Sequence, residues 1–332
     1  MGLSKIKKKI RLLSSYLYDY YVYQNASLTD SHRDVNGTHA LGLIIRLYHT
    51  IEKGLSVRER KLEFSLGNVK LLQDKLLSYT GDKNEAHIKS AIITLDCYFN
   101  EHPDDGLSNE FIEERERFQQ LKKQYKINDI TVGGGIKDIV EVELLDNETA
   151  LKFIRSRVSV REFDNNKSLE FCDLVKVIDL AKRCPSACNR HAIKIYYSLD
   201  INQNQKILEL QNGSRTFRHN VPGLMIVTSD LRYQEGIEER NLGYIEGGIW
   251  LMSLVNSLYL HGLSSCVLNW CVSPKVDREL KDLLCIPYYH QISGLIAFGY
   301  SKPSQKVPYS IRCDSQEFLR KINISLQLED AN

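Results

Sequence analysis

The spacing of apolar residues changes character part-way along the chain, and this change limits the fold more than any other feature of the sequence. Over residues 40–51, 62–77, 88–99 and 111–125, apolar side chains recur every three or four positions, which is the period of one face of an α-helix. From residue 146 onwards, helical patterns alternate with short apolar runs typical of strands. We therefore predict an all-helical N-terminal region followed by an α+β domain.

The chain has 332 residues, which is enough for two domains that each bury a core of their own. The glycine run at residues 133–135 matches neither of the phosphate-binding glycine motifs, so a flexible linker is the better interpretation. We predict a helical region over residues 1–130, a linker over 131–145 and a second domain over 146–325.

The second domain is expected to contain a succession of helices and strands. The predicted elements are a helix over 171–181 capped by Ser168, strands over 193–199 and 223–228, a helix over 239–260, a strand over 266–268, a helix from Ser273-Pro274 to Leu284, and a strand over 292–298. The helix over 239–260 is apolar around most of its circumference, so we expect it to be buried.

Composition excludes several classes of protein. A hydrophobic content of 42% with 26% charged residues is that of a globular chain. The formal net charge of +2 gives no broad basic surface for nucleic acid. Eight cysteines are too sparse for a disulfide scaffold, and their spacings lack the CxxC pairs of a metal site. With no secretory signal and no spanning apolar run, a cytoplasmic protein with reduced thiols and no metal is expected.

Residues 3–23 form a basic amphipathic pattern, with lysines and an arginine crowded at its start. Such a helix can lie on an anionic membrane, but helices of this kind more often pack against their own protein. We therefore favour packing over peripheral membrane contact through residues 1–25.

A polar group occurs in the second predicted helix, where His49, Glu52 and Lys53 lie about one turn apart. A charged helix face that ends at Gly54 as its C-cap explains this group better than a catalytic site does.

Three separated segments carry residues suited to a phosphorylated, planar ligand. In the first, Arg157, Ser159 and Arg161 alternate, so an extended backbone would point them the same way, and guanidinium and hydroxyl groups bind phosphate. The second is the loop over residues 184–191, which contains turn residues, and the third is Ser310-Ile-Arg312 beyond the last strand. Each segment alone also has an ordinary explanation, which is a charged edge or surface strand for the first, a turn for the second and a solvated tail for the third.

Together and in this order, the segments resemble the nitroreductase superfamily of flavoproteins over residues 148–312. The resemblance implies that Arg157, Ser159 and Arg161 bind the phosphate and ribityl chain of FMN, that Pro185, Ser186 and Asn189 lie along the isoalloxazine ring, that Leu268 and Asn269 belong to the loop facing flavin N5, and that Ser310 and Arg312 close on the phosphate. It also implies a mixed β-sheet flanked by helices, in a homodimer whose two subunits line each flavin.

The implied activity is that of an oxidoreductase, in which NAD(P)H reduces FMN and the flavin passes electrons to a small organic acceptor. The acceptor would be a nitro or quinone compound or a biosynthetic intermediate. The sequence departs from the family after Asn189, where members often continue Asn-x-Gln-Pro-Trp and this chain reads Asn189-Arg190-His191-Ala192-Ile193. It departs again at Trp270, which could shield the substrate face. The alternative is therefore a non-catalytic flavin- or partner-binding protein with the same fold.

Overall fold

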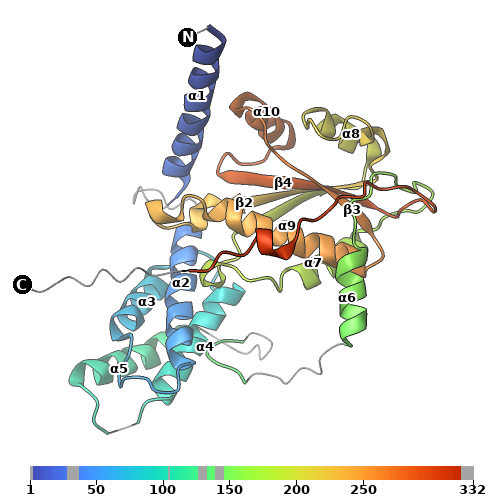
Figure 1. Ribbon diagram of the computed structural model, residues 1–332. Helices are drawn as coiled ribbons and strands as arrows, with labels where there is room; N and C mark the ends of the chain where they lie inside the picture. The colour runs from blue at the N-terminus through green and yellow to red at the C-terminus, as the bar shows by residue number, and fades with distance from the viewer. Residues whose placement is uncertain (1–2, 28–36, 104, 126–132, 139–145, 323–332) are drawn as a thin grey trace, which may run out of the picture.

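The structure is a computed structural model that describes residues 3–27, 37–103, 105–125, 133–138 and 146–322, with side chains from residue 6 onwards. Its N-terminal region is helical, as predicted (Figure 1). The helices are α1 (Leu3–Ala26), α2 (Thr38–Leu55), α3 (Leu66–Ser78), α4 (Ala86–Asn100) and α5 (Asn109–Gln124).

Helices α2 to α5 enclose a core of their own. Ile44 on α2, Leu72 on α3, Leu95 on α4 and Phe118 on α5 are all fully buried in it. Aromatic rings extend the packing, since the ring centroids of Phe99 and Phe118 lie 5.3 Å apart. The helical periodicity of the sequence therefore reports a real buried face on each of these helices.

The prediction that Gly54 caps the second helix is wrong. Gly54 lies inside α2, which ends at Leu55 with Ser56 as its C-cap. A Cβ at position 54 would lie 2.2 Å from the ring of Phe64, so close packing explains this glycine. His49 and Glu52 do interact as their spacing indicated, with 3.1 Å between Nδ1 and Oε2.

The glycine run, which lies in the predicted linker, contacts α4. Ser90 Oγ donates to the carbonyl of Gly133, and the backbone N–H of Gly135 donates to Thr94 Oγ1. A Cβ at Gly134 would lie 2.6 Å from the Ser90 carbonyl oxygen. The remainder of the predicted linker, except residues 136–138, lies outside the described residues.

The second part of the chain has the α+β composition that the sequence indicated. Its main elements are α6 (Asn147–Ser156), α7 (Phe171–Ala181), β1 (Ile193–Ser198), α8 (Ile201–Glu209), β2 (Gly223–Asp230), α9 (Leu242–Leu260), β3 (Ser264–Leu268), α10 (Pro274–Leu284) and β4 (His290–Gly299). Short 3₁₀ turns lie between or after these elements, at η1 (Ala187–Asn189), η2 (Arg218–Asn220), η3 (Leu231–Tyr233), η4 (Ile237–Glu239) and η5 (Ser315–Glu317).

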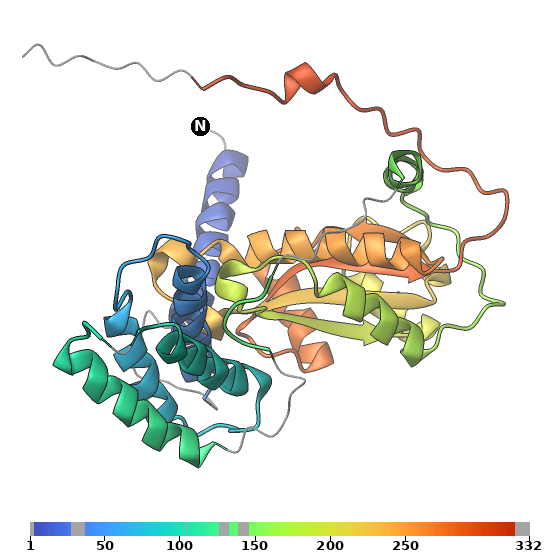
Figure 2. The same cartoon turned by 90° about the horizontal axis from the view of Figure 1, so that it is seen from below.

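The four strands form one sheet in the order β1-β2-β4-β3, with every neighbouring pair antiparallel. A single parallel bridge, between Ser159 and Ser265, joins the segment with Ser159 to β3. Helices α7 and α9 cover one face, and α8 and α10 cover the other, which is visible in Figures 1 and 2. Strand β2 is buried along its whole length because both faces of the sheet are covered.

Two helix starts test the capping predictions. Ser273 accepts a hydrogen bond from the N–H of Val276, and Pro274 occupies the first turn of α10, as predicted. Ser168 does not cap α7, because Glu170 occupies the N-cap position and forms a reciprocal capping box with Asp173.

Helix α1 packs through the face opposite to the one that the sequence indicated. Val22 is buried near its C-terminal end, whereas the apolar stripe remains 43–64% exposed. The exposed stripe comprises Ile6, Ile10, Leu13, Leu17, Tyr20 and Tyr21. Figure 1 shows the N-terminal half of α1 standing clear of the rest of the chain. The prediction that the stripe packs against its own chain is therefore wrong within the described residues.

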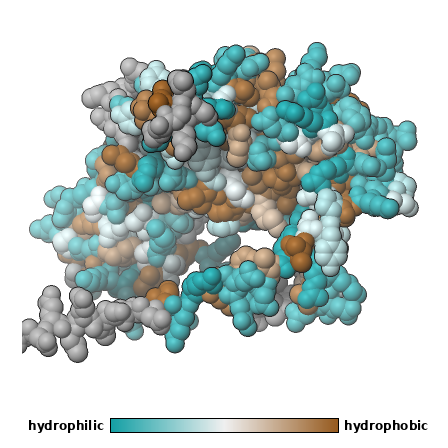
Figure 3. Space-filling model, turned by 45° about the horizontal axis from the view of Figure 1, so that its top comes forward, coloured by the Kyte–Doolittle hydropathy of each residue, from teal (hydrophilic) through white to brown (hydrophobic). Residues whose placement is uncertain are grey.

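Helix α9 begins at Leu242, after the separate turn η4, and is buried on one side only. Trp250 and Leu254 face the sheet, whereas Ile245 and Met252 are at least half exposed. Apolar side chains gather over the middle of the face presented in Figure 3. No helix among the described residues combines the length and apolarity needed to cross a membrane.

Candidate functional site

The segment with the predicted phosphate-binding residues runs alongside β3. The N–H of Val160 donates to the carbonyl of Ser265 at 3.0 Å, and Val160 itself is buried. Arg157, Ser159 and Arg161 are all half-buried, consistent with one side of an extended segment. The alternation in the sequence thus reflects the local geometry.

The two arginines of this segment lack acidic partners in the described part of the chain. Arg161 makes one weak hydrogen bond, from Nη1 to the carbonyl of Ser159 at 3.5 Å. Burial raises the pKa of the neighbouring Cys266 thiol, and the positive charge of Arg161 opposes that rise. Half-buried guanidinium groups without carboxylates favour an anionic ligand such as a phosphate, so the residues fit the phosphate end of FMN.

The loop over residues 184–191, called the proline loop from here on, has a backbone conformation that few sequences adopt. Cys188, Asn189 and His191 have φ values of +51°, +56° and +46°. Left-handed backbone at non-glycine residues is unfavourable and persists only where neighbouring contacts hold it. Ser186 supplies one such contact, because its Oγ accepts a hydrogen bond from the N–H of His191.

Two acidic residues hold the same loop from other elements. Glu246 on α9 is 3% exposed, and its Oε1 accepts the N–H of Ala187 at 2.6 Å. Burial raises the pKa of Glu246, which the hydrogen bond from Ala187 and the charge of Arg190 oppose. Arg190 is itself buried and forms a bidentate pair with Glu239, at 2.6 and 3.0 Å.

The end of β3 and the loop that follows it are only partly available to a ligand. Leu268 is 5% exposed and packs in the core, so only its backbone can face a cofactor. Asn269 is exposed, and its carbonyl accepts a hydrogen bond from Gln211 Nε2 at 3.1 Å. The side chain of Leu268 is thus buried and that of Asn269 is exposed, although the resemblance assigned both residues to the loop facing the flavin.

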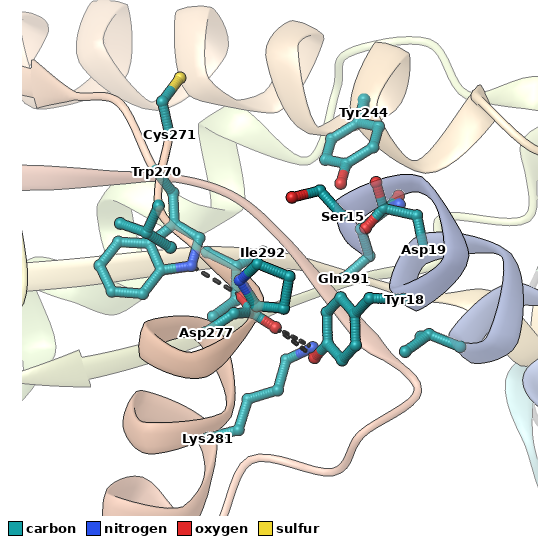
Figure 4. A pocket seen from close by; sticks show the side chains of 13 residues that line it. Ser15, Tyr18, Asp19, Tyr244, Trp270, Cys271, Asp277, Lys281, Gln291 and Ile292 are labelled. Carbon is teal, nitrogen blue, oxygen red and sulfur yellow. Dashed lines mark hydrogen bonds and ion pairs between the residues drawn. The ribbon is translucent and has the colours of Figure 1, made fainter. Parts of the chain in front are cut away.

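A cavity of about 140 Å³ lies beside this loop, between α1 and the second part of the chain (Figure 4). Asp277 on α10 organises its wall by accepting hydrogen bonds from Tyr18 at 2.7 Å and from the Trp270 indole at 2.8 Å. Lys281 pairs with the same carboxylate at 2.9 Å. Trp270 is therefore held in one position beside the cavity.

Ser310 and Arg312 are exposed and do not join the other predicted residues within one chain. The hydrogen bonds of Arg312 are made to the carbonyls of Ser310 and Ile311, in its own segment. Figure 2 shows this segment running past α6 and away from the sheet. The convergence of Arg157, Arg161 and Arg312 that the sequence led us to expect is absent from the single chain.

Several residues that shape the site carry no recognisable motif. Glu246 and Glu239 act on the loop from separate elements, through Ala187 and through Arg190 of the loop itself. Glu246 lies in a mostly apolar helix, and an acidic residue in such a pattern is the one signal that the sequence offered.

The sheet with helices on both faces defines an α+β domain, and Arg157 and Arg161, which have no acidic partner among the described residues, lie in a segment along its β3 edge. Residues 154–300 match the family model described as "Nitroreductase family". The C-terminal half of the chain is therefore a nitroreductase-like domain, preceded by an additional helical region.

Solved structures with a similar fold include an FMN-dependent nitroreductase from Clostridium difficile R20291, with 18% identity and a TM-score of 0.44 over 52% of this chain and 99% of that chain. NfrA2 of B. megaterium has 18% identity and a TM-score of 0.45, over 54% of this chain and 76% of that chain. A nitroreductase family protein from Streptococcus pneumoniae TIGR4 has 19% identity and a TM-score of 0.45, over 52% and 100%. Among curated proteins, none matches this sequence. The family match supports an oxidoreductase function.

Proposed function

We propose that the protein is an FMN-dependent oxidoreductase that takes electrons from NAD(P)H and passes them to a small organic acceptor. The observation that carries the proposal is the pair of half-buried guanidinium groups of Arg157 and Arg161, which flank Ser159 and have no acidic partner among the described residues. Bound FMN would supply the hydride and electron-transfer chemistry.

The chain's own residues would place the cofactor and limit access to it. Arg157, Ser159 and Arg161 would bind the phosphate, and the loop with Ser186 and Asn189 would line the ring. Glu246 keeps that loop in place through the Ala187 amide. The cavity beside Trp270 is the proposed position of the acceptor, because its wall is the loop assigned to the substrate side of the flavin.

The proposal includes a homodimer, because large apolar side chains lack cover in a single chain. Tyr309, Ile311 and Ile322 in the C-terminal segment are 94%, 82% and 86% exposed, and Ile245 and Met252 on α9 are 58% and 50% exposed. Exposed apolar surface on this scale is typical of a protein interface. A second copy that covers the C-terminal segment could also bring Arg312 to a phosphate.

A non-catalytic flavin-binding protein is the second candidate, and the fixed position of Trp270 favours it. The indole is hydrogen-bonded to Asp277 at 2.8 Å and would narrow the approach to the flavin. Anaerobic addition of NADH or NADPH distinguishes the two functions. The enzyme would lose its flavin colour, whereas the binding protein would keep it.

The test of the arginine pair is an FMN titration followed by absorption. Arg157→Gln and Arg161→Gln are each expected to weaken FMN binding at least tenfold, since a hydrogen bond to a charged group contributes about 1.5–3 kcal/mol. Arg155→Gln is the matched control, because Arg155 is exposed on α6 two residues away. A wild-type protein that is colourless and takes up no FMN would exclude the proposed function.

A further inference from the structure

Helix α1 is anchored to the rest of the chain near its C-terminal end. The hydroxyl of Tyr18 donates to Asp277 on α10 at 2.7 Å, and that of Tyr23 donates to the carbonyl of Gly236 at 2.6 Å. Val22 is buried between these two tyrosines in the sequence. The first half of the helix extends beyond these anchors (Figure 1).

The apolar stripe of α1 lies on the side of the helix opposite to Val22. Ile10, Leu13 and Leu17 recur every three or four residues, so they share one face, and each is more than half exposed. Tyr20 and Tyr21 extend the stripe towards the C-terminal end and are also more than half exposed. A tyrosine has an apolar ring and a polar hydroxyl, which suits a boundary between apolar and aqueous surroundings.

Basic side chains border the N-terminal half of the stripe. Lys7 follows Ile6 and Lys9 precedes Ile10, so the step of about 100° per residue in an α-helix places the two lysines on opposite sides of the stripe. Both lysines and Arg11 are exposed. Their long side chains can extend along the apolar surface while the charged ends stay in a polar layer.

A bilayer surface with anionic lipid matches the charge of α1 better than a second copy of the chain does. Residues 3–18 include five basic residues and no acidic one. Asp19, the first acidic residue of the helix, lines the cavity together with Tyr18 and Val22 (Figure 4). A second α1 would therefore cover the stripe without supplying acidic partners to the basic side chains, whereas anionic headgroups neutralise them.

We propose that α1 binds the surface of a bilayer that contains anionic lipid. The apolar stripe enters the boundary between headgroups and acyl chains, and Lys7, Lys9 and Arg11 lie at the level of the lipid phosphates. The contacts of Tyr18 and Val22 stay intact, because they belong to the opposite side of the helix. This surface is separate from the candidate flavin site, so the inference does not depend on the proposed function.

The test is co-sedimentation of the full chain with vesicles of two compositions. One set contains phosphatidylcholine alone, and the other contains equal parts of phosphatidylcholine and phosphatidylserine. We expect the protein to bind the mixed vesicles at least tenfold more tightly, and added salt to weaken this binding because it screens the charges.

The contribution of charge is measured with a variant that combines Lys7→Gln, Lys9→Gln and Arg11→Gln. Binding to the mixed vesicles should weaken about fivefold for each charge removed, the ratio that corresponds to about 1 kcal/mol. A control variant removes the same number of charges from exposed lysines on other helices and should bind as the wild type does. It combines Lys123→Gln, Lys206→Gln and Lys275→Gln.

The contribution of the stripe is measured with a variant that combines Ile10→Ser, Leu13→Ser and Leu17→Ser. It should bind the mixed vesicles at least tenfold more weakly, because it loses the apolar surface that enters the bilayer. Its FMN binding should equal that of the wild type. The control variant replaces apolar residues of similar exposure elsewhere and should keep its vesicle binding. It combines Leu77→Ser, Ile112→Ser and Leu283→Ser.

Three results would overturn the inference. The first is wild-type protein that stays in solution with the mixed vesicles. The second is charge or stripe variants that bind these vesicles as tightly as their controls. The third is a stripe variant that, without vesicles, has a smaller mass by light scattering than the wild type, because a second copy would then cover the stripe. None of these results bears on FMN binding, which the titration measures separately.

Discussion

Asp230, at the end of β2, is a fully buried carboxylate stabilised by two neighbours. Arg232 donates to it from Nε at 2.9 Å and from Nη2 at 2.7 Å, and His290 Nε2 lies 3.5 Å from Oδ2. Burial alone would raise the pKa of Asp230, but hydrogen bonds from Arg232 and His290 outweigh it and lower the pKa to about 2. The ionised form therefore stabilises the fold.

We expect Asp230→Asn to lower the free energy of unfolding by about 2 kcal/mol at pH 7, since each pKa unit corresponds to about 1.4 kcal/mol. The folded pKa lies below the unfolded value of about 4, so the contribution is complete above pH 4 and disappears as the pH falls towards 2. Urea unfolding of both proteins between pH 7 and pH 2 measures the difference. A gap that stays constant across this range would contradict the assignment. Asp105→Asn, at an exposed position without an ion pair among the described residues, is the control and should have no measurable effect.

At the scale of residues, one part of the candidate site could be predicted from the sequence and another part could not. The alternation of Arg157, Ser159 and Arg161 is local, so an extended backbone is enough to place them together. The left-handed loop around Asn189 is held in part by Glu246, which bonds Ala187, is distant in sequence and belongs to no motif. Such contacts can be recognised only once the chain is folded.

At the scale of elements, α1 presents its apolar stripe to solvent, and this has a direct consequence for stability. Combined serine substitutions at Ile10, Leu13 and Leu17 should change the unfolding free energy by less than about 0.5 kcal/mol each, because exposed positions rarely matter more. Val22→Asp should instead undock α1, because it places a charge in a buried position. Tryptophan fluorescence reports docking, since Trp270 lies in the wall of the cavity that α1 covers.

In this experiment the triple serine variant should keep the wild-type emission, and Val22→Asp should shift it to longer wavelength. A large loss of stability in the triple variant would mean that a contact absent from the single chain covers the stripe.

At the scale of the whole molecule, the exposed C-terminal segment predicts how the protein assembles. A chain that ends after Pro308 lacks Ile311, Arg312 and Phe318, of which the two apolar residues are 82% and 72% exposed. We expect light scattering to show a dimer for the full chain and a monomer for the shortened chain. The shortened chain should also bind FMN at least tenfold more weakly, because it lacks the charge of Arg312. Its thermal stability as a monomer should be little changed, because these side chains are exposed in the single chain. A shortened chain that remains dimeric would exclude this part of the proposal.

The sequence by itself determined the elements whose signals are local. Helical periodicity in the first 125 residues, the cap at Ser273-Pro274 and the alternation at residues 157–161 each depend on neighbours within a few positions, and each appears in the structure. Only the tertiary structure decided which face of α1 is buried, why Gly134 lies against α4, and how α2 packs against the segment with Tyr233 and Glu235. These outcomes depend on the fit between surfaces far apart in the chain, and a periodic pattern specifies that a face is apolar without specifying what will cover it.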